Sequence, residues 1–212
     1  MTTINVRGFA RAEVSPDFAA IHCSANAEAD SAVEAQDRAA DIATAMRAAT
    51  AETAGVRSLR LSRVSVYERQ QWNDTTQTQE SAGWSATISG VCEADVAEAG
   101  AITGMLVEAG ATIGHLQWCL EEDNPAYREV RTQAVHDARR AAEDFAAALS
   151  ARVGELISLA DPGLLTGGGP EAMPRAAMFD GVRAAKAVPI DSVDIEVSAS
   201  VEASYRLDDV KN

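Results

Sequence analysis

Hydrophobic and polar residues alternate along several stretches of the chain, a pattern that predicts strands with one face in water. The alternation is clearest in residues 4–14, 19–27 and 193–205. The sequence Ser15-Pro16-Asp17, between the first two of these stretches, is typical of a turn. We therefore expect the first two strands to pair as a hairpin. Further strands are predicted at residues 59–68, 84–94, 111–121 and 156–160, and the polar run 73–81 is predicted to be an exposed hairpin loop.

Three other stretches repeat apolar residues every three or four positions, which predicts helices that pack one face against a core. The first begins at a capping sequence, with Glu34 three residues after Ser31, and is expected to end at Gly55. The second spans residues 96–109. The third is predicted over 126–153, with Gly154 ending it and an apolar stripe of Val130, Ala134, Ala138, Ala141, Phe145 and Leu149.

These elements follow one another in the order ββαββαβαββ. Intermixed helices and alternating strands predict an α+β fold of two layers, with a mainly antiparallel sheet and helices packed on one face. We expect a single domain over residues 1–207 and a frayed tail at 208–212. Residues 161–189 are rich in proline and glycine yet contain Met173, Met178 and Phe179, so this loop is predicted to be mobile or an oligomer contact.

The charge of the chain narrows the classes of partner. With 32 acidic and 18 basic residues, the formal net charge is -14 at pH 7. Nucleic acids and anionic membranes both attract clustered Lys and Arg, so neither is an expected partner. No apolar stretch approaches the roughly 18 residues of a membrane-spanning helix, and the first residues lack the pattern of a signal peptide. The sequence as written predicts a cytoplasmic protein, or a periplasmic one if a leader has been removed.

Cysteine and histidine do not form a recognised site in the sequence. The three cysteines are an odd number without a CxxC pair, which favours free buried thiols at Cys23, Cys92 and Cys119. His115 and Cys119 fall on one face of a predicted strand, but four residues of strand separate them by roughly 13 Å. That distance is too long for two ligands of one metal. We interpret His22, His115 and His136 as surface or partly buried structural residues.

Two further segments carry residue types found at binding sites. Gly167-Gly168-Gly169 lacks the Lys and the helix of a phosphate-binding loop, so it is interpreted as a linker. Glu121-Glu122-Asp123 precedes a helix, whose dipole explains an acidic cluster at that place. We therefore expect no enzymatic activity, no catalytic residue, no cofactor and no metal site. A hydrolase or metal enzyme using His115 with Glu121–Asp123 is the alternative left open.

Aromatic residues make up only 5% of the chain, which makes their positions informative. Phe9 and Phe18 fall on the faces of the first two strands that alternation assigns to water. Either a second helix covers them or they contact another subunit. The predicted residues for self-association or ligand contact are Phe9, Phe18, Trp84, Trp118, Met173, Met178 and Phe179.

Three segments together resemble the SIMPL-domain family. Residues 4–19, INVRGFARAEVSPDFA, are similar to its opening strand, with a glycine and a Pro-Asp turn; residues 134–159 are similar to its Ala-rich helix leading through a glycine into a strand; and residues 194–207 are similar to its last strand. The resemblance implies an α+β fold with no established enzymatic activity. It also implies bacterial relatives in the periplasm or at the outer membrane. This sequence departs from the family in lacking a leader and in having Ala148-Leu149-Ser150 where the family has Ala-Leu-Gly.

The sequence thus predicts a non-enzymatic, acidic protein that forms homo-oligomers, with an envelope or stress-related role. The alternative is a binding module for a small molecule or peptide. In that alternative, loop 161–189 would close over the sheet face around Trp84 and Trp118.

Overall fold

The fold is described from a computed structural model, which describes residues 2–74, 77–161 and 190–209. The chain divides into two compact units, each described by itself. Of the described residues, the first unit takes 2–15, 121–161 and 194–209, and the second takes those within 16–120 and 190–193. The range 1–207, predicted as one domain, therefore contributes to two compact units.

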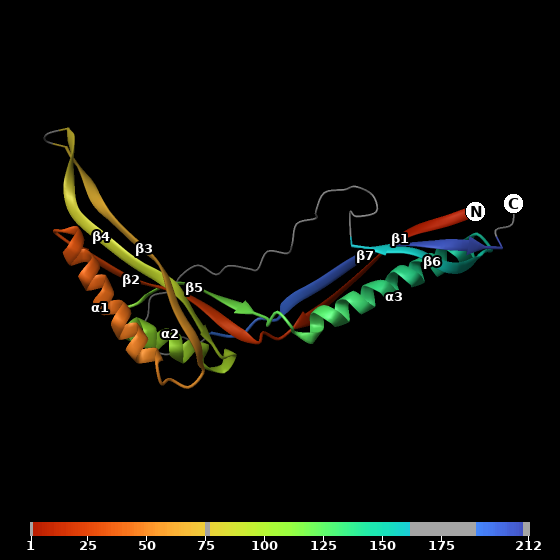
Figure 1. The fold of residues 1–212 in the computed structure, drawn as a ribbon, viewed down its shortest axis with the longest axis horizontal. Coiled ribbons are helices and arrows are strands. Elements are labelled where there is room, and N and C mark those ends of the chain that lie inside the picture. Colours follow the sequence, from red (N-terminus) through yellow and green to blue (C-terminus); the bar gives the residue numbers. More distant parts are fainter. Residues whose placement is uncertain (1, 75–76, 162–189, 210–212) are drawn as a thin grey trace. The chain divides into compact units, whose positions relative to one another are not determined.

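The first unit is a three-stranded antiparallel sheet with one helix packed along it (Figure 1). Its strands lie in the order β1 (Thr2–Val14), β7 (Ile195–Asp208), β6 (Arg152–Ala160). The helix, α3 (Pro125–Ala148), covers the face formed by alternate residues of β1 and β7. β1 pairs with β7 over its whole length, so strands from opposite ends of the sequence are direct neighbours.

The backbones of β1 and α3 approach each other closely at Gly8. A Cβ atom at this position would lie 2.0 Å from the carbonyl oxygen of Ala134 and 2.4 Å from the backbone nitrogen of Ala138. A glycine on the strand and alanines on the helix together make this approach possible, because any larger side chain would hold the two backbones apart.

The predicted stripe of α3 is right in its first half and wrong in its second. The residues that are buried are Val130, Ala134, Ala138, Ala142 and Ala146. Phe145 and Leu149, which the sequence placed in the stripe, are 59% and 54% exposed. Close packing on the sheet favours the smallest side chains at the contact, whereas the prediction chose the most hydrophobic ones.

The end of α3 also differs from the prediction. The helix ends at Ala148, and Ser150 turns the chain with a φ of 53°. Gly154 lies inside β6, not at the end of the helix. The strand therefore begins earlier than the apolar run that predicted it.

The second unit is a four-stranded antiparallel sheet in the order β3-β4-β2-β5. The strands are β2 (Phe18–Ala29), β3 (Val56–Asn73), β4 (Thr78–Ala94) and β5 (Thr112–Cys119). Two α-helices and a 3₁₀ turn accompany it: α1 (Ala32–Thr50), η1 (Val96–Glu98) and α2 (Ala99–Glu108).

Both α-helices of the second unit pack on the same face of its sheet. The core there joins Ile21 and Cys92 of the sheet to Met46 of α1 and to Ile102 and Leu106 of α2. We call the opposite face of this sheet the outer face. In the part of the chain that the structure describes, no helix covers it.

α1 begins as predicted. Its N-cap Ser31 accepts a hydrogen bond from the backbone N–H of Glu34 at 3.2 Å, which satisfies one of the free amides of the first turn. The helix ends at Thr50, before the predicted Gly55, which instead adopts a φ of 83° in the turn that leads into β3.

β3 and β4 form a longer hairpin than the sequence predicts. They pair as far as Asn73 opposite Thr78, so most of the polar run 73–81 lies in a strand. β2 accompanies β4 only as far as Ala29 opposite Trp84, and beyond that point β3 and β4 continue as a two-stranded ribbon (Figure 1). Polar residues are compatible with a strand that has no core beneath it.

The α+β class is confirmed, and the order of elements matches the prediction apart from the added 3₁₀ turn η1. The strands form two antiparallel sheets, where a single sheet was predicted. The predicted hairpin between the first two strands is wrong, because β1 pairs with β7 while β2 pairs with β4 and β5. The segment between them does not fold back on itself: the backbone N–H of Asp17 donates to the carbonyl of Cys119 at 2.9 Å, which attaches it to β5.

Candidate functional site

The two edge strands of the first unit differ in how they are protected. At the β1 edge, the backbone N–H of Phe9 donates to Oδ2 of Asp137 on α3 at 3.0 Å, and Arg140 donates to the other oxygen of that carboxylate at 2.5 Å. These two hydrogen bonds, the one from Phe9 foremost, lower the pKa of Asp137. A charged side chain at this point blocks the pairing of another strand with β1.

The edge formed by β6 is apolar, and no other described strand pairs with it. Leu156, Ile157 and Leu159 are 44%, 49% and 47% exposed. α3 lies mainly over β1 and β7, so it leaves the apolar side chains of β6 largely uncovered. We call Leu156, Ile157 and Leu159, with the unpaired backbone side of β6, the β6 edge.

The outer face of the second unit holds a depression of ≈ 330 Å³. Its lining comes from all four strands: His22, Cys23, Ser24, Ser62, Arg63, Ser89, Gly90, Val91 and Gly114. The strand register explains the grouping, because Ser24 of β2 lies opposite Ser89 of β4, which lies opposite Arg63 of β3. We call this hollow the outer-face depression.

Two histidines stack beside the outer-face depression. His22 lies opposite His115 across β2 and β5, and their ring centroids are 4.0 Å apart with an interplanar angle of 15°. Burial, and then the nearby charge of His115, lower the pKa of His22. The two rings are nearly parallel, so the lone pairs of their nitrogen atoms lie in separate planes. They do not converge on a single metal ion.

The strand pairing is irregular on both sides of the depression. The register shifts between Leu61 and Arg63 on β3, and it shifts again where β2 passes from His115 to Ile113 on β5. The extra residues at these bulges, Ser62 and Gly114, both line the depression. β-Bulges change the direction of side chains and are common beside functional sites.

A second hollow of ≈ 310 Å³ lies against β1 and α3, lined by Phe9, Ala10, Arg11, Gln133, His136, Asp137 and Arg140. Of its charged groups, Arg140 pairs with Asp137, and Arg11 pairs with Glu196 on β7. Asp137 already binds Phe9 and Arg140, as described above. We therefore treat this hollow as part of the β1–α3 packing.

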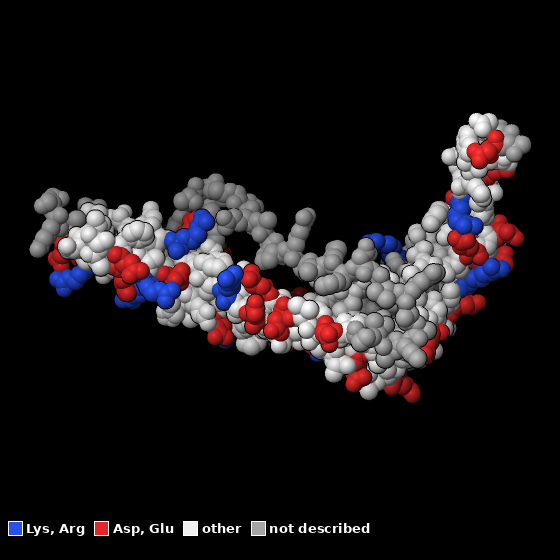
Figure 2. Space-filling view, turned by 180° about the vertical axis from the view of Figure 1, so that it is seen from behind, with Lys and Arg blue, Asp and Glu red and all other residues white. Residues whose placement is uncertain are grey.

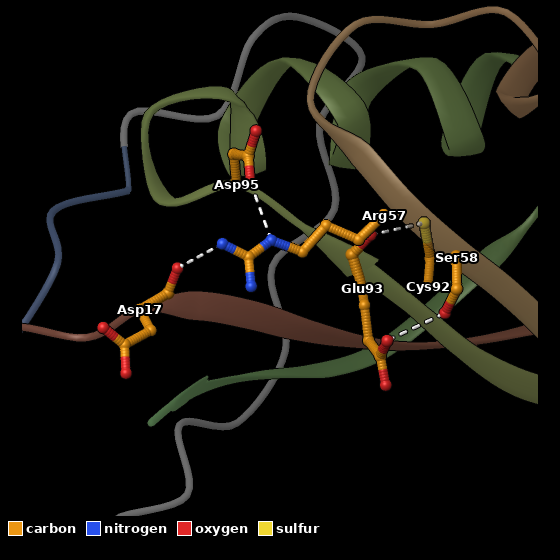
Figure 3. Close-up of polar contacts among 6 residues, drawn as sticks. All are labelled: Asp17, Arg57, Ser58, Cys92, Glu93 and Asp95. Atoms are coloured by element: carbon orange, nitrogen blue, oxygen red, sulfur yellow. Dashed lines mark hydrogen bonds and ion pairs between the residues drawn. The ribbon is translucent and has the colours of Figure 1, made fainter. Parts of the chain in front are cut away.

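Arg57 fixes the start of β2 to the start of β3 (Figure 3). Its Nε donates to Asp95 at 2.7 Å and a terminal nitrogen donates to the carbonyl of Asp17 at 2.8 Å. The guanidinium also lies over the ring of Phe18, 5.3 Å from its centroid. Phe18 is therefore half-buried beneath a charged side chain.

The remaining predicted contact residues lie in different places. Phe9 is 54% exposed on β1. Trp84 is half-buried and packs against Ala35 and Ala39 of α1, and Trp118 is half-buried opposite Ala19 on the helix-covered face of the sheet. Met173, Met178 and Phe179 lie outside the described residues.

The residues of the alternative enzyme hypothesis divide between the two units, with His115 in the second and Glu121–Asp123 in the first. His115 stacks on His22, and within residues 2–74, 77–161 and 190–209 no group of three or more His, Cys, Asp or Glu could hold a metal ion. The sequence analysis missed both the His22–His115 pair and the β6 edge. The first depends on a strand register that crosses about ninety residues, and the second on how little of β6 the helix covers.

The cysteines are free, as predicted. Burial raises the pKa of Cys23 and of Cys92 to about 11. Burial also raises the pKa of Cys119, which is only partly buried. At neutral pH the two buried thiols are therefore protonated and unreactive.

Charged residues form pairs on the surface. Figure 2 shows Asp and Glu side chains interspersed with Lys and Arg on the visible face. Arg7 with Glu202 and Arg11 with Glu196 bridge β1 and β7 in this way. No helix in the described ranges is both long and apolar enough to cross a membrane.

Comparison with protein families gives one match: the model for SIMPL, described as a protein of unknown function (DUF541), matches residues 4–205. The matched range includes elements of both compact units. A search of curated proteins finds no match to the chain.

Proposed function

The chain belongs to the SIMPL family, whose function is unknown, and we propose that it is a non-enzymatic protein that self-associates through the β6 edge. One observation carries the proposal: Leu156, Ile157 and Leu159 are exposed on a strand that has a neighbour on one side only among the described strands. An apolar edge strand with unpaired N–H and C=O groups is a template for pairing with another strand.

The occupant that we propose for the β6 edge is the same edge of a second copy. Antiparallel pairing of two identical strands is self-complementary and produces a closed two-fold dimer. The β1 edge offers no equivalent surface, because Asp137 caps it at Phe9. A continuous chain of copies joined β6 to β1 is therefore disfavoured.

The distribution of charge also favours the β6 edge as the contact between two copies. Two copies of a chain with net charge -14 repel each other over most of their surfaces. β6 contains one basic residue, Arg152, and one acidic residue, Glu155, so its own charge is zero. The β6 edge is thus a place where two acidic copies can meet at little electrostatic cost.

The non-enzymatic part of the proposal is supported by the state of the candidate nucleophiles. The pKa of about 11 at Cys23 and Cys92 keeps both thiols protonated near pH 7. The nitrogen atoms of the stacked His22 and His115 are not directed at a nucleophile by any hydrogen bond that the structure shows. The envelope or stress-related role is proposed from the family resemblance alone.

Sedimentation or light scattering at tens of micromolar protein tests the self-association. We expect the wild type to show twice the mass of one chain, and Leu159→Lys to show the mass of one chain, because each copy would have to bury an ammonium group in the paired edges. Val33→Lys is the control, since Val33 is 71% exposed but lies on a helix, α1, and belongs to the second unit. It should remain a dimer.

The proposal fails if the wild type is strictly monomeric under these conditions. It also fails if Leu159→Lys, with an unchanged circular dichroism spectrum, dimerises as well as Val33→Lys does. In that case another surface holds the copies together.

A further inference from the structure

We propose that the outer-face depression binds a compact tetrahedral oxyanion, namely a phosphate or sulfate group, free or as part of a small molecule. This site belongs to the second unit and shares no residue with the β6 edge. It is independent of self-association. It names a class of ligand for a chain whose family has no known function.

The depression gathers hydrogen-bond donors from three strands. Arg63, Ser89 and Ser24 form a row across β3, β4 and β2, and His22 lies in the next row on the same face. Neighbouring strands are about 4.8 Å apart and successive rows on one face about 6.7 Å apart, so one small anion reaches several of these side chains. Four oxygen atoms pointing in different directions match such a spread of donors better than the two oxygens of a planar carboxylate.

Two of these donors are free to bind a ligand. The hydroxyl oxygen of Ser24 accepts a hydrogen bond from Asn26 at 3.0 Å, which leaves its hydrogen available to donate. Among the described residues, none forms a hydrogen bond or ion pair with the guanidinium of Arg63. A guanidinium binds phosphate-type oxyanions through two parallel N–H groups.

The local charge is opposite to that of the whole chain. Although 32 of the residues are acidic, none of those that line the depression is. The carboxylate nearest in the strand register, Glu93, lies one row beyond His22 and Val91 and is held by Arg60. The hydroxyl of Ser58 also donates to it at 2.9 Å (Figure 3). An anion in the depression therefore meets Arg63 without a competing free carboxylate.

The backbone around the outer-face depression is irregular. The bulges at Ser62 and Gly114 interrupt regular pairing on both sides of it. Gly90, between them on β4, would place a Cβ atom 1.9 Å from the carbonyl oxygen of Arg60, so the bulged path of β3 requires glycine there. Two bulges and a glycine that meet at one hollow distinguish it from the rest of the outer face.

Protonation of His22 adds to the binding. The charged or titratable groups around His22 on this face are His115 on β5, Arg60 and Arg63 on β3, and Glu93 on β4. A bound anion stabilises the imidazolium form of His22, and a proton on His22 strengthens anion binding by the same factor. Affinity therefore rises as pH falls through the lowered pKa of His22.

The test is a titration of the intact protein with inorganic phosphate at pH 6, followed by the backbone amide NMR signals of Ser24, Ser89 and Gly114. Sodium acetate and sodium chloride at equal ionic strength are the comparison anions. We expect saturable shifts with phosphate and weaker, non-saturating shifts with the other two. Arg63→Gln should weaken phosphate binding about tenfold or more, as loss of a charged hydrogen-bond donor does.

Arg47→Gln is the matched control, because it removes the same charge from the last turn of α1, on the other side of the sheet. It should leave the affinity for phosphate nearly unchanged. Ser89→Ala provides a second, less disruptive change and should weaken binding several-fold. Sulfate, whose charge is constant between about pH 5 and 8, should bind more weakly as pH rises, and His22→Gln should flatten this dependence.

Three results would overturn the proposal. Shifts with chloride equal to those with phosphate would show a general response to ionic strength. Equal affinity for acetate would contradict recognition of a tetrahedral anion. Equal effects of Arg63→Gln and Arg47→Gln would place the anion elsewhere.

Discussion

Gly8 illustrates how a single residue determines the distance between a helix and a strand. In Gly8→Ala the new methyl group would lie 2.0 Å from the carbonyl oxygen of Ala134, so α3 or β1 must move. We expect this overpacking to cost about 1–3 kcal/mol of unfolding free energy. Urea denaturation followed by far-UV circular dichroism measures it.

Gly154→Ala is the control for this substitution. Its Cβ atom would meet Oδ2 of Asp208 at 2.5 Å, but that atom ends a flexible side chain that can turn away. A smaller loss of stability is therefore expected. If the two variants lose the same amount, the close approach of backbones at Gly8 is not the cause.

The buried thiols give a second prediction at this scale. With a pKa of about 11, Cys23 and Cys92 are only ~0.1% thiolate at pH 8, and alkylating reagents attack the thiolate. We expect one thiol, Cys119, to react first in the folded protein and all three to react in denaturant. Mass spectrometry of the modified peptides identifies the order. Rapid modification of Cys92 in the native state would contradict the structure.

The sequence predicts burial of a residue better than it predicts its partners. Cys23 and Cys92 are buried as expected, because an apolar alternation and an odd cysteine count both point that way. The stacking of His22 on His115 was not predictable, since it requires the register of β2 on β5. The same register gathers Ser24, Ser89 and Arg63, so the candidate anion site is a property of the pairing and has no linear motif.

At the scale of elements, the buried stripe of α3 can be tested directly. Ala142 is buried on the sheet, whereas Phe145 is 59% exposed. We expect Ala142→Leu to destabilise the first unit by about 1–3 kcal/mol and Phe145→Ala to change its stability by about 0.5 kcal/mol or less. Thermal denaturation of both variants checks this. If Phe145→Ala cost more stability than Ala142→Leu, the stripe predicted from the sequence would be right.

Asp137 links α3 to the edge of β1, and its contribution depends on pH. Because its pKa is lowered in the folded state, the carboxylate stabilises the fold above the ordinary Asp pKa, and this stabilisation is lost as pH falls through the lowered value. We expect Asp137→Asn to cost about 1 kcal/mol or less near pH 7, since the group is partly exposed, and to cost nothing in strong acid. Denaturation curves at several pH values measure the difference.

Asp144→Asn is the comparison for this effect. Asp144 also lies on α3 and is exposed, but no strand edge binds it. Its replacement should have no pH-dependent cost of this kind. A similar pH dependence in both variants would mean that the net charge of α3, and not the contact with Phe9, is responsible.

The sequence identified the elements of this fold more successfully than their neighbours. Where polarity alternates clearly, as in 4–14, 19–27 and 193–205, the pattern located a strand because it reports which face is buried, whichever strand lies alongside. The same pattern in residues 4–14 and 19–27 is equally compatible with a hairpin and with two separate sheets. The turn at Pro16 therefore predicted pairing that β1 and β2 do not make.

At the scale of the whole molecule, the two compact units contain different reporters. All three tryptophans, Trp72, Trp84 and Trp118, belong to the second unit. Tryptophan fluorescence therefore follows the unfolding of that unit, whereas circular dichroism follows both. We expect Gly8→Ala to shift the circular dichroism transition of the first unit and to leave the fluorescence transition where it is in the wild type. Coincident shifts of both signals would show that the units unfold as one.

The pairing of β1 with β7 has a consequence for the order in which the protein is made. All strands and helices of the second unit lie within residues 16–120. The four-stranded sheet and its helices can therefore fold while the ribosome is still adding later residues. β1 emerges first but must wait for residues 195–208, at the far end of the chain, before it has a neighbour. Until then β1 lacks the backbone partner that it has in the folded unit, so the first unit is completed only after the last strand has been made.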